Sequence, residues 1–256
     1  MCGIVGFTGK TQAAGFLLEG LERLEYRGYD SAGIAVLNDN NLTVCKTTER
    51  IKNLTEKTNG GKDIHGTTGI GHTRWATHGA PSDKNAHPHT SSDGKFAVVH
   101  NGIIENYIAL REELKAEGVE FKSETDTEVI PQLLARCYTG DFFEAVAKTV
   151  KRLEGSYALG IICTDYLDTL IAVRKFSPLI LGLSDDANYI ASDVTAIVSH
   201  TKDIMYIEDG EIAVLTPCGV KLYDGDKNEL HREPAVINWD VSAAEKGGYD
   251  HFMMKE

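Results

Sequence analysis

Short strand-like segments on both sides of a helical middle restrict this chain to a sheet-rich fold. Before the middle, strand signals fall at 3–8, 32–37, 42–47, 68–73 and 96–100, and after it at 156–164, 168–174, 179–183, 188–191, 204–208, 211–216 and 219–223. Helical periodicity predicts helices at 11–25, 50–58, 105–117, 126–138 and 142–153. Because the strands follow one another in hairpins and not in β–α–β order, the pattern predicts an α+β fold of antiparallel sheets packed with helices.

Two local predictions follow from turn and cap residues. The last three strands read as a meander with turns at Asp209-Gly210 and Cys218-Gly219. The segment Thr125-Asp126-Thr127-Glu128 is typical of a helix N-terminus, where acids are favourable for the helix dipole.

Charge and length exclude several classes of protein. The chain has 256 residues, which favours one or two domains, and its formal net charge is −12 with no basic run. Phosphate binding needs clustered Lys and Arg, so no nucleic-acid partner is expected. No leader pattern follows Met1, and no apolar run approaches the roughly 18–20 residues of a membrane span, so we expect no membrane association and a cytoplasmic protein.

Cysteine and histidine spacing gives no sign of a metal site. The five cysteines form no CxxC pair, which argues against a cysteine zinc site or a disulfide framework. Five histidines gather in the middle of the sequence without an HExxH motif: His72, His78, His87, His89 and His100. Because they lack ligand spacing, we predict no metal there.

Cys2 is unusual because of its position. Methionine is removed efficiently before a small residue, and its loss would leave Cys2 with a free α-amine beside its thiol. The amine has a reference pKa of about 7.7–8.0 and the thiol about 8.5, so one residue can supply both nucleophile and base. If Met1 is retained, the Cys2 nitrogen is an amide and cannot act as a base, and the protein should be inactive or nearly so.

Five segments that carry chemically useful residues follow Cys2 along the chain. They are Gly3-Ile4-Val5-Gly6, Tyr26-Arg27-Gly28-Tyr29-Asp30-Ser31-Ala32-Gly33, Gly71-His72-Thr73-Arg74-Trp75-Ala76-Thr77-His78-Gly79, Val98-Val99-His100-Asn101-Gly102-Ile103-Ile104-Glu105-Asn106 and Ser123-Glu124-Thr125-Asp126-Thr127-Glu128. Together, after Met-Cys, they resemble the class II glutamine amidotransferases over nearly the whole chain. The resemblance implies an N-terminal nucleophile hydrolase fold, a four-layer αββα sandwich of two antiparallel sheets.

The resemblance also implies a role for each matching residue. Arg74 would bind the α-carboxylate of glutamine through paired guanidinium donors, and Asp126 its α-ammonium. The Asn101 side-chain amide and the Gly102 backbone N–H would form the oxyanion hole. Thr77 and His78 would line the glutamine pocket. Trp75 would lie on the loop that closes over the substrate and help gate ammonia. Arg27 and Gly28 would help fix the N-terminus.

The implied reaction converts L-glutamine and water into glutamate and ammonia through a γ-glutamyl thioester on Cys2, with no cofactor. Trp75 and Tyr29 favour the branch that delivers ammonia to fructose 6-phosphate and yields glucosamine 6-phosphate. That branch implies a glutaminase domain at 2–237, a linker at 238–256 toward a C-terminal sugar-phosphate isomerase domain of the same chain, and a homodimeric full-length enzyme.

Several alternatives stay open. Within the family these are amidophosphoribosyltransferase and asparagine synthetase. Another class of N-terminal cysteine amide hydrolase, acting on bile salts or penicillins, has no use for Arg74 and Asp126 as an amino-acid clamp. A non-catalytic binding module would keep its role after a Cys2→Ala substitution.

Overall fold

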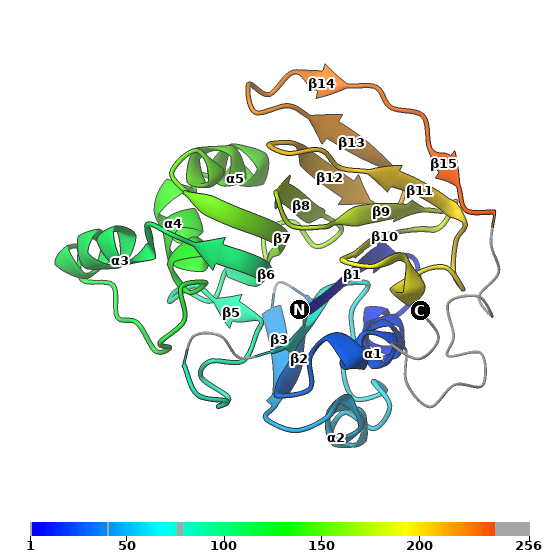
Figure 1. Ribbon diagram of the computed structural model, residues 1–256, viewed down its shortest axis with the longest axis horizontal. Coiled ribbons are helices and arrows are strands. Elements are labelled where there is room, and N and C mark those ends of the chain that lie inside the picture. Colours follow the sequence, from blue (N-terminus) through cyan, green and yellow to red (C-terminus); the bar gives the residue numbers. More distant parts are fainter. Residues whose placement is uncertain (1, 40, 76–78, 239–256) are drawn as a thin grey trace.

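Two antiparallel sheets dominate the computed structural model, which describes residues 2–39, 41–75 and 79–238 (Figure 1). The first sheet runs in the spatial order β15 (Ala235–Val236), β11 (Asp203–Tyr206), β9 (Ile180–Leu183), β10 (Ala187–Ala191), β1 (Gly3–Gly9), β4 (Thr68–Arg74), β2 (Ser31–Asn38) and β3 (Asn41–Thr47). The second runs in the order β14 (Glu229–Leu230), β13 (Gly219–Tyr223), β12 (Ile212–Thr216), β8 (Leu170–Lys175), β7 (Gly155–Cys163), β6 (Phe96–Ile104) and β5 (His89–Thr90).

Helices form the two outer layers. One layer comprises α1 (Ala13–Arg23) and α2 (Ile51–Lys57), and the other α3 (Tyr107–Ala116), α4 (Val129–Cys137) and α5 (Phe142–Val150). Two short 3-10 turns also occur: η1 (Glu25–Arg27) lies between α1 and β2, and η2 (Val194–Ala196) lies between β10 and β11. The predicted α+β fold with antiparallel sheets is confirmed.

Apolar clusters separate the four layers. β1 shows how they arise, because alternate side chains of a strand point to opposite faces of its sheet. Val5 packs with α1 residues such as Leu17 and Leu21, whereas Ile4 joins Ile70 in the cluster between the two sheets. A further cluster lies between the second sheet and α3–α5. Strands buried on both faces therefore read as nearly continuous apolar runs.

Most strand predictions are confirmed, but the meander prediction is wrong. β11 pairs with β9 in the first sheet, whereas β12 pairs with β8 and β13 in the second. Asp209-Gly210 is therefore a crossover between sheets, although Cys218-Gly219 does form a hairpin turn with β13. A short polar turn is compatible with either connection, and only the packing of the two sheets distinguishes them.

The helix predicted from residue 126 begins at Val129. The acids before it make tertiary contacts in place of capping: an Asp126 oxygen accepts a hydrogen bond from the Ile104 backbone N–H, at 2.8 Å. β6 is also longer than the predicted 96–100, because β7 pairs with it through Ile104. Asn101 and Gly102 therefore lie within a strand.

None of the helices in the part of the chain that the structure describes has both the length and the hydropathy that crossing a membrane requires.

Candidate active site

Cys2 lies at the start of β1, beside the end of β4. The Trp75 backbone N–H donates to the Cys2 Sγ at 3.2 Å, and the thiol lies 3.6 Å from the Trp75 carbonyl oxygen. Burial raises the pKa of the Cys2 thiol, against the lowering effect of the Trp75 backbone hydrogen bond. The thiol is therefore protonated at neutral pH in this environment, and attack on a carbonyl needs a base to remove its proton.

Asn101 reaches Cys2 from the opposite sheet. Its Nδ2 donates to the Cys2 carbonyl oxygen at 3.0 Å. The next residue, Gly102, has a φ of 132°, and a Cβ there would lie 2.0 Å from the Ser156 carbonyl oxygen. Only glycine fits this position of β6. The Gly102 backbone lies beside Cys2, and both residues line the same cavity.

Gly28 allows η1 to approach the end of β4. A Cβ on Gly28 would lie 2.7 Å from the Arg74 carbonyl carbon and 2.9 Å from the Trp75 nitrogen, the atom whose hydrogen bonds to the thiol. Its neighbour Arg27 forms an ion pair with Asp193, which ties η1 to the loop before η2. Arg27 and Gly28 thus support the backbone that contacts Cys2.

We expect Gly28→Ala to destabilise the protein, because the added methyl group collides with backbone atoms that cannot rotate away. The free energy of unfolding in urea should fall by about 1–3 kcal/mol. Gly15→Ala is the matched control, since Gly15 lies in α1 with nothing within 4 Å of an added Cβ. That variant should gain about 0.5–1 kcal/mol. Equal stabilities for the two variants would contradict the proposed close approach.

Arg74 and Asp126 meet Cys2 around one cavity. Its lining includes Cys2, Arg74, Gly102 and Asp126, and the space in it that water-sized molecules can occupy is about 30 Å³. Arg74 is 4% exposed and Asp126 6% exposed. A buried cation and a buried anion thus face the same space as the nucleophile, as binding of a free amino acid requires.

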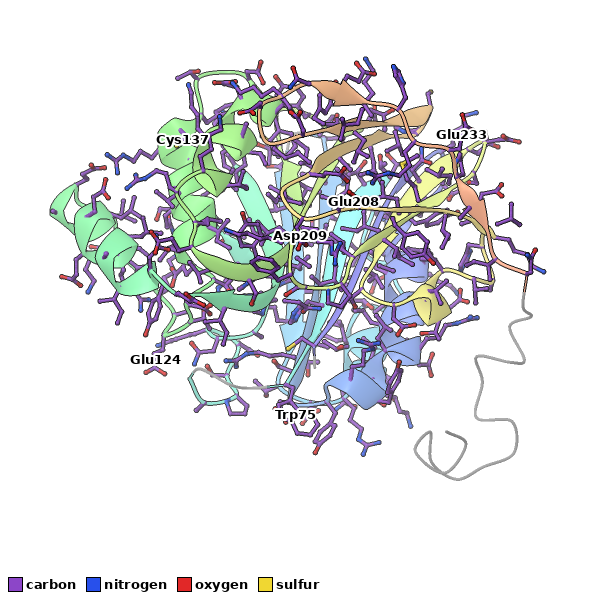
Figure 2. The ribbon with its side chains drawn as sticks, turned by 45° about the horizontal axis from the view of Figure 1, so that its top comes forward. Trp75, Glu124, Cys137, Glu208, Asp209 and Glu233 are labelled. Atoms are coloured by element: carbon purple, nitrogen blue, oxygen red, sulfur yellow. The ribbon has the colours of Figure 1, made fainter. Side chains whose placement is uncertain are left out.

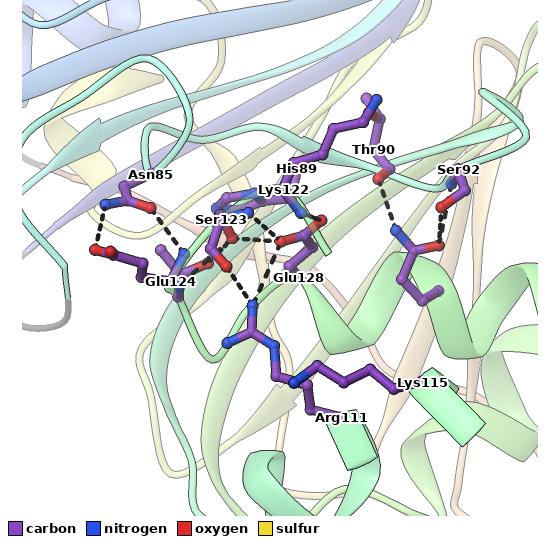
Figure 3. A network of polar contacts seen from close by, with 12 residues as sticks. Asn85, His89, Thr90, Ser92, Arg111, Lys115, Lys122, Ser123, Glu124 and Glu128 are labelled. Atoms are coloured by element: carbon purple, nitrogen blue, oxygen red, sulfur yellow. Dashed lines mark hydrogen bonds and ion pairs between the residues drawn. The ribbon is translucent and has the colours of Figure 1, made fainter. Parts of the chain in front are cut away.

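A polar network holds the segment that carries Asp126 (Figure 3). Glu128 accepts hydrogen bonds from the backbone and the hydroxyl of Ser123, both at 2.6 Å, and lies 3.7 Å from the Arg111 guanidinium. The Asn85 side chain accepts from the Glu124 backbone N–H at 2.9 Å. These contacts join the loop after the α3 helix to the segment before β5, so the Asp126 carboxylate is held by tertiary structure.

A buried histidine cluster borders the cavity, and the sequence, in which these histidines show no ligand spacing, did not predict that their rings meet. Rings of His72 and His87 lie 4.1 Å apart, and those of His87 and His89 4.7 Å apart. The Thr127 hydroxyl lies within hydrogen-bond distance of His87 Nε2 and of His100 Nδ1. Strand alternation offered one signal, because His72 lies two residues before Arg74 and so on the same face of β4.

We expect these four histidines to make stability depend on pH. Burial lowers the pKa of His72 to about 3, and it lowers the pKa of His87, His89 and His100 as well. In the unfolded chain each ring titrates near about 6.5. Below that pH the unfolded state binds protons that the folded state excludes, so the free energy of unfolding falls as the pH drops from about 6.5 toward 3.

Between pH 7 and pH 5.5 the loss should be about 1 kcal/mol for His72, and His87, His89 and His100 should add losses of the same sign. Urea unfolding at the two pH values measures it, above the range where most carboxylates titrate. A His87→Gln variant should lose less stability over the same interval. An unfolding free energy that is the same at both pH values would show that the rings are not buried in the neutral form.

A second, larger cavity also borders Cys2. Its lining includes Cys2, Trp75, Asn101, Gly102 and Ile103, and the space in it that water-sized molecules can occupy is about 380 Å³. Trp75 is 46% exposed and contacts the Tyr29 ring edge to face at 5.5 Å. Figure 2 shows Trp75 projecting from the surface. The expected pocket residues Thr77 and His78 lie outside the described residues.

Comparisons with known proteins agree with this arrangement. The sequence profile of a family described as "Glutamine amidotransferase domain" matches residues 72–199. The chain is 57% identical over its whole length to a glutamine–fructose-6-phosphate aminotransferase (isomerizing) of Clostridium acetobutylicum, and 55% identical to that of Aquifex aeolicus. It spans 42% and 43% of the length of these two relatives.

A solved structure shares the fold. The glutamine phosphoribosylpyrophosphate amidotransferase from B. subtilis superposes with a TM-score of 0.77 at 27% identity, covering 89% of this chain and 50% of that one. Sequence identity is thus about twice as high toward the aminotransferases as toward this phosphoribosyl relative. The family profile spans half of the chain, and the chain belongs to the glutamine amidotransferase domain family.

Proposed function

We propose that this chain hydrolyses L-glutamine to glutamate and ammonia, with Cys2 as the nucleophile. The observation that carries the proposal is that Cys2, Arg74 and Asp126 all line the same cavity. A guanidinium and a carboxylate can bind the α-carboxylate and the α-ammonium of a free amino acid. The side-chain amide of that amino acid then extends toward the thiol.

The Cys2 α-amine, freed by loss of Met1, is the base in this proposal. His87 and His100 line the same cavity, but burial lowers the pKa of both rings, which makes them weak bases. An α-amine has a reference pKa of about 7.7–8.0, suited to accept the thiol proton near neutral pH and return it to the leaving ammonia. Nucleophile and base then belong to one residue.

The reaction proceeds in two balanced steps. The Cys2 sulfur attacks the side-chain carboxamide, the C–N bond breaks, and ammonia leaves with the proton from the thiol. Water then cleaves the γ-glutamyl thioester and restores the thiol. Asn101 Nδ2 and the Gly102 N–H are proposed to stabilise the tetrahedral oxyanion of both steps, where one lost donor costs about 10²–10³ in rate.

An electrophilic glutamine analogue tests this proposal directly. Incubation of the Met-free protein with a glutamine analogue that carries a reactive ketone should give one adduct per chain, on residue 2, by peptide mass spectrometry. Excess glutamine should slow the labelling, and glutamate should be released from glutamine in steady state. Absence of both glutamate release and glutamine binding would refute the hydrolase.

A substrate panel separates the rival functions. Preference for bulky acyl amides over glutamine would favour a bile-salt or penicillin type of hydrolase. A non-catalytic module would keep its biological role after Cys2→Ala. The buried charges of Arg74 and Asp126 at the cavity argue against both rivals, because neither needs an amino-acid clamp.

For the full-length protein we propose, on the family resemblance, that the ammonia converts fructose 6-phosphate to glucosamine 6-phosphate; the relatives' name, glutamine–fructose-6-phosphate aminotransferase (isomerizing), supports this proposal. The chain's coverage of only 42% of such a relative leaves room for a sugar-phosphate isomerase domain. The cavity between Cys2, Trp75 and Ile103 is the proposed exit for ammonia. Release of free ammonia from the isolated chain, but not from the full-length enzyme supplied with fructose 6-phosphate, would support this coupling.

The domain limits are also proposed. Buried Ile237, whose N–H donates to the Lys202 carbonyl at 2.8 Å, supports a glutaminase domain at 2–237. The linker proposed at 238–256 lies, apart from residue 238, outside the described residues. On the family resemblance we propose a homodimer for the full-length enzyme, which sedimentation equilibrium would test.

A further inference from the structure

We propose that His72 is a positioning residue that holds the Asn101 side-chain amide in the orientation needed by the oxyanion hole. The inference rests on the proposed function, because it assigns a role within the same reaction. His72 lies on β4 of the first sheet and Asn101 on β6 of the second, so the contact crosses the space between the sheets.

The contact with the Cys2 carbonyl fixes which way the Asn101 amide points. One end of the amide lies 3.0 Å from the Cys2 carbonyl oxygen. A carbonyl oxygen can only accept a hydrogen bond, so the amide end that faces it is the NH2 group. The Asn101 Oδ1 consequently faces the other way, toward His72 Nε2 at 3.0 Å.

Two acceptor oxygens beside His72 Nε2 fix the position of the proton on the ring. His72 Nε2 lies 3.0 Å from the Asn101 Oδ1 and 3.1 Å from the His100 carbonyl oxygen, and both of these atoms are acceptors. Nε2 must therefore carry the proton. The other nitrogen, Nδ1, is buried and has no hydrogen-bond partner among the described residues. The opposite tautomer would bury an Nδ1–H without an acceptor and would turn the lone pair of Nε2 toward the Asn101 and His100 oxygens. Its free energy would therefore be higher.

The His72 ring is held more rigidly than the Asn101 amide. The His72 ring is fully buried and packs against the His87 ring, whereas the terminal torsion of an asparagine side chain has a broad, roughly twofold preference. Without the His72 N–H, the Asn101 amide can rotate by half a turn. It would then present an oxygen where the developing negative charge of the tetrahedral intermediate needs a donor.

This orientation of the Asn101 amide suits catalysis. An amide NH2 group carries two hydrogens, and one of them is used on the Cys2 carbonyl. The second remains available to the oxyanion that forms on the substrate's amide oxygen when the Cys2 sulfur attacks the carbonyl carbon. Asn101 and Gly102 line the same cavity beside Cys2, so a donor from each can converge there.

Two substitutions in two backgrounds test the role. His72→Phe keeps a planar ring but removes the donor, whereas His72→Gln restores a side-chain N–H of similar reach. We expect His72→Phe to lower kcat by about 10²-fold with the KM for glutamine within about threefold, near the cost of one lost oxyanion donor. We expect His72→Gln to recover about tenfold of that loss.

The decisive comparison is made in an Asn101→Ala background. If His72 acts through Asn101, His72→Phe there should change kcat by less than about threefold. Equal losses of kcat in both backgrounds, or a His72→Gln variant as poor as His72→Phe, would overturn the positioning role. An active wild type with these results leaves the proposed hydrolase intact, while an inactive wild type refutes the hydrolase itself.

A spectroscopic measurement decides the tautomer even if a variant does not fold. In the wild-type protein labelled with ¹⁵N-histidine, long-range proton–nitrogen spectra should show a protonated Nε2 and a bare Nδ1 for His72. A protonated Nδ1 would overturn the proposal, because Nε2 could then donate nothing to Asn101.

Discussion

Cys2→Ser should abolish glutaminase activity while the protein still folds and binds glutamine. A hydroxyl of nearly the same size replaces the thiol, and serine also permits removal of Met1, so the free α-amine is kept. The hydroxyl is a much weaker nucleophile than a thiol, and loss of an enzyme's nucleophile typically lowers kcat by about 10⁴–10⁶-fold. Steady-state glutamate release, with intact mass to verify Met1 removal, measures the effect.

Cys218→Ser is the matched control for this experiment. Cys218 is an exposed free cysteine in the turn between β12 and β13, and it lines neither of the two cavities beside Cys2. Its activity should stay within about twofold of wild type. Comparable losses in the two variants, or a Cys2→Ser protein that keeps more than a few per cent of the activity, would exclude Cys2 as the nucleophile.

Asp126→Asn should raise the KM for glutamine by about 30-fold or more. Asparagine keeps a side-chain oxygen that can still accept from the Ile104 N–H, so the local fold contact survives while the charge is lost. Removing one partner of a buried charge pair typically costs about 2–5 kcal/mol, which corresponds to this range of affinity. Initial-rate kinetics over a wide range of glutamine concentrations measure it.

Discrimination against a substrate without the α-amine tests the cause. The wild-type protein should strongly prefer glutamine over glutaramic acid, the monoamide of glutaric acid, which lacks only the ammonium group, and Asp126→Asn should narrow that preference. Glu124→Gln, an exposed acid in the same segment, should leave the KM within about twofold. An unchanged preference in Asp126→Asn would mean that another group binds the ammonium.

Local patterns in the chain were informative because they depend on near neighbours. Both faces of the β1 strand are buried, and its apolar run predicted a strand at nearly the observed limits. Hairpins such as β2–β3 and β12–β13 were predictable for the same reason, since a turn and two flanking strands lie within a few residues. The motif segments around Cys2, Arg74 and Asp126 predicted the family and thereby the layered fold.

Positions that depend on distant partners were less predictable. The Asp126 segment looked like a helix start, but its carboxylate bonds to β6, 22 residues away. β6 itself extends through Asn101 because β7 pairs with it along its whole length. Nothing in the adjacent residues signals either contact.

The amino-acid sequence by itself predicted the strands along the chain, Cys2 as the nucleophile and Arg74 and Asp126 as the amino-acid clamp. The strands follow from periodicity, the choice of Cys2 from its position and its motif, and the clamp from the family resemblance of the motif segments, all of which are read from neighbouring residues. The tertiary structure alone decided that β11 and β12 belong to different sheets, and that His72 meets Asn101. Such pairings depend on how two sheets pack face to face, where the energies of many weak contacts between distant segments are summed.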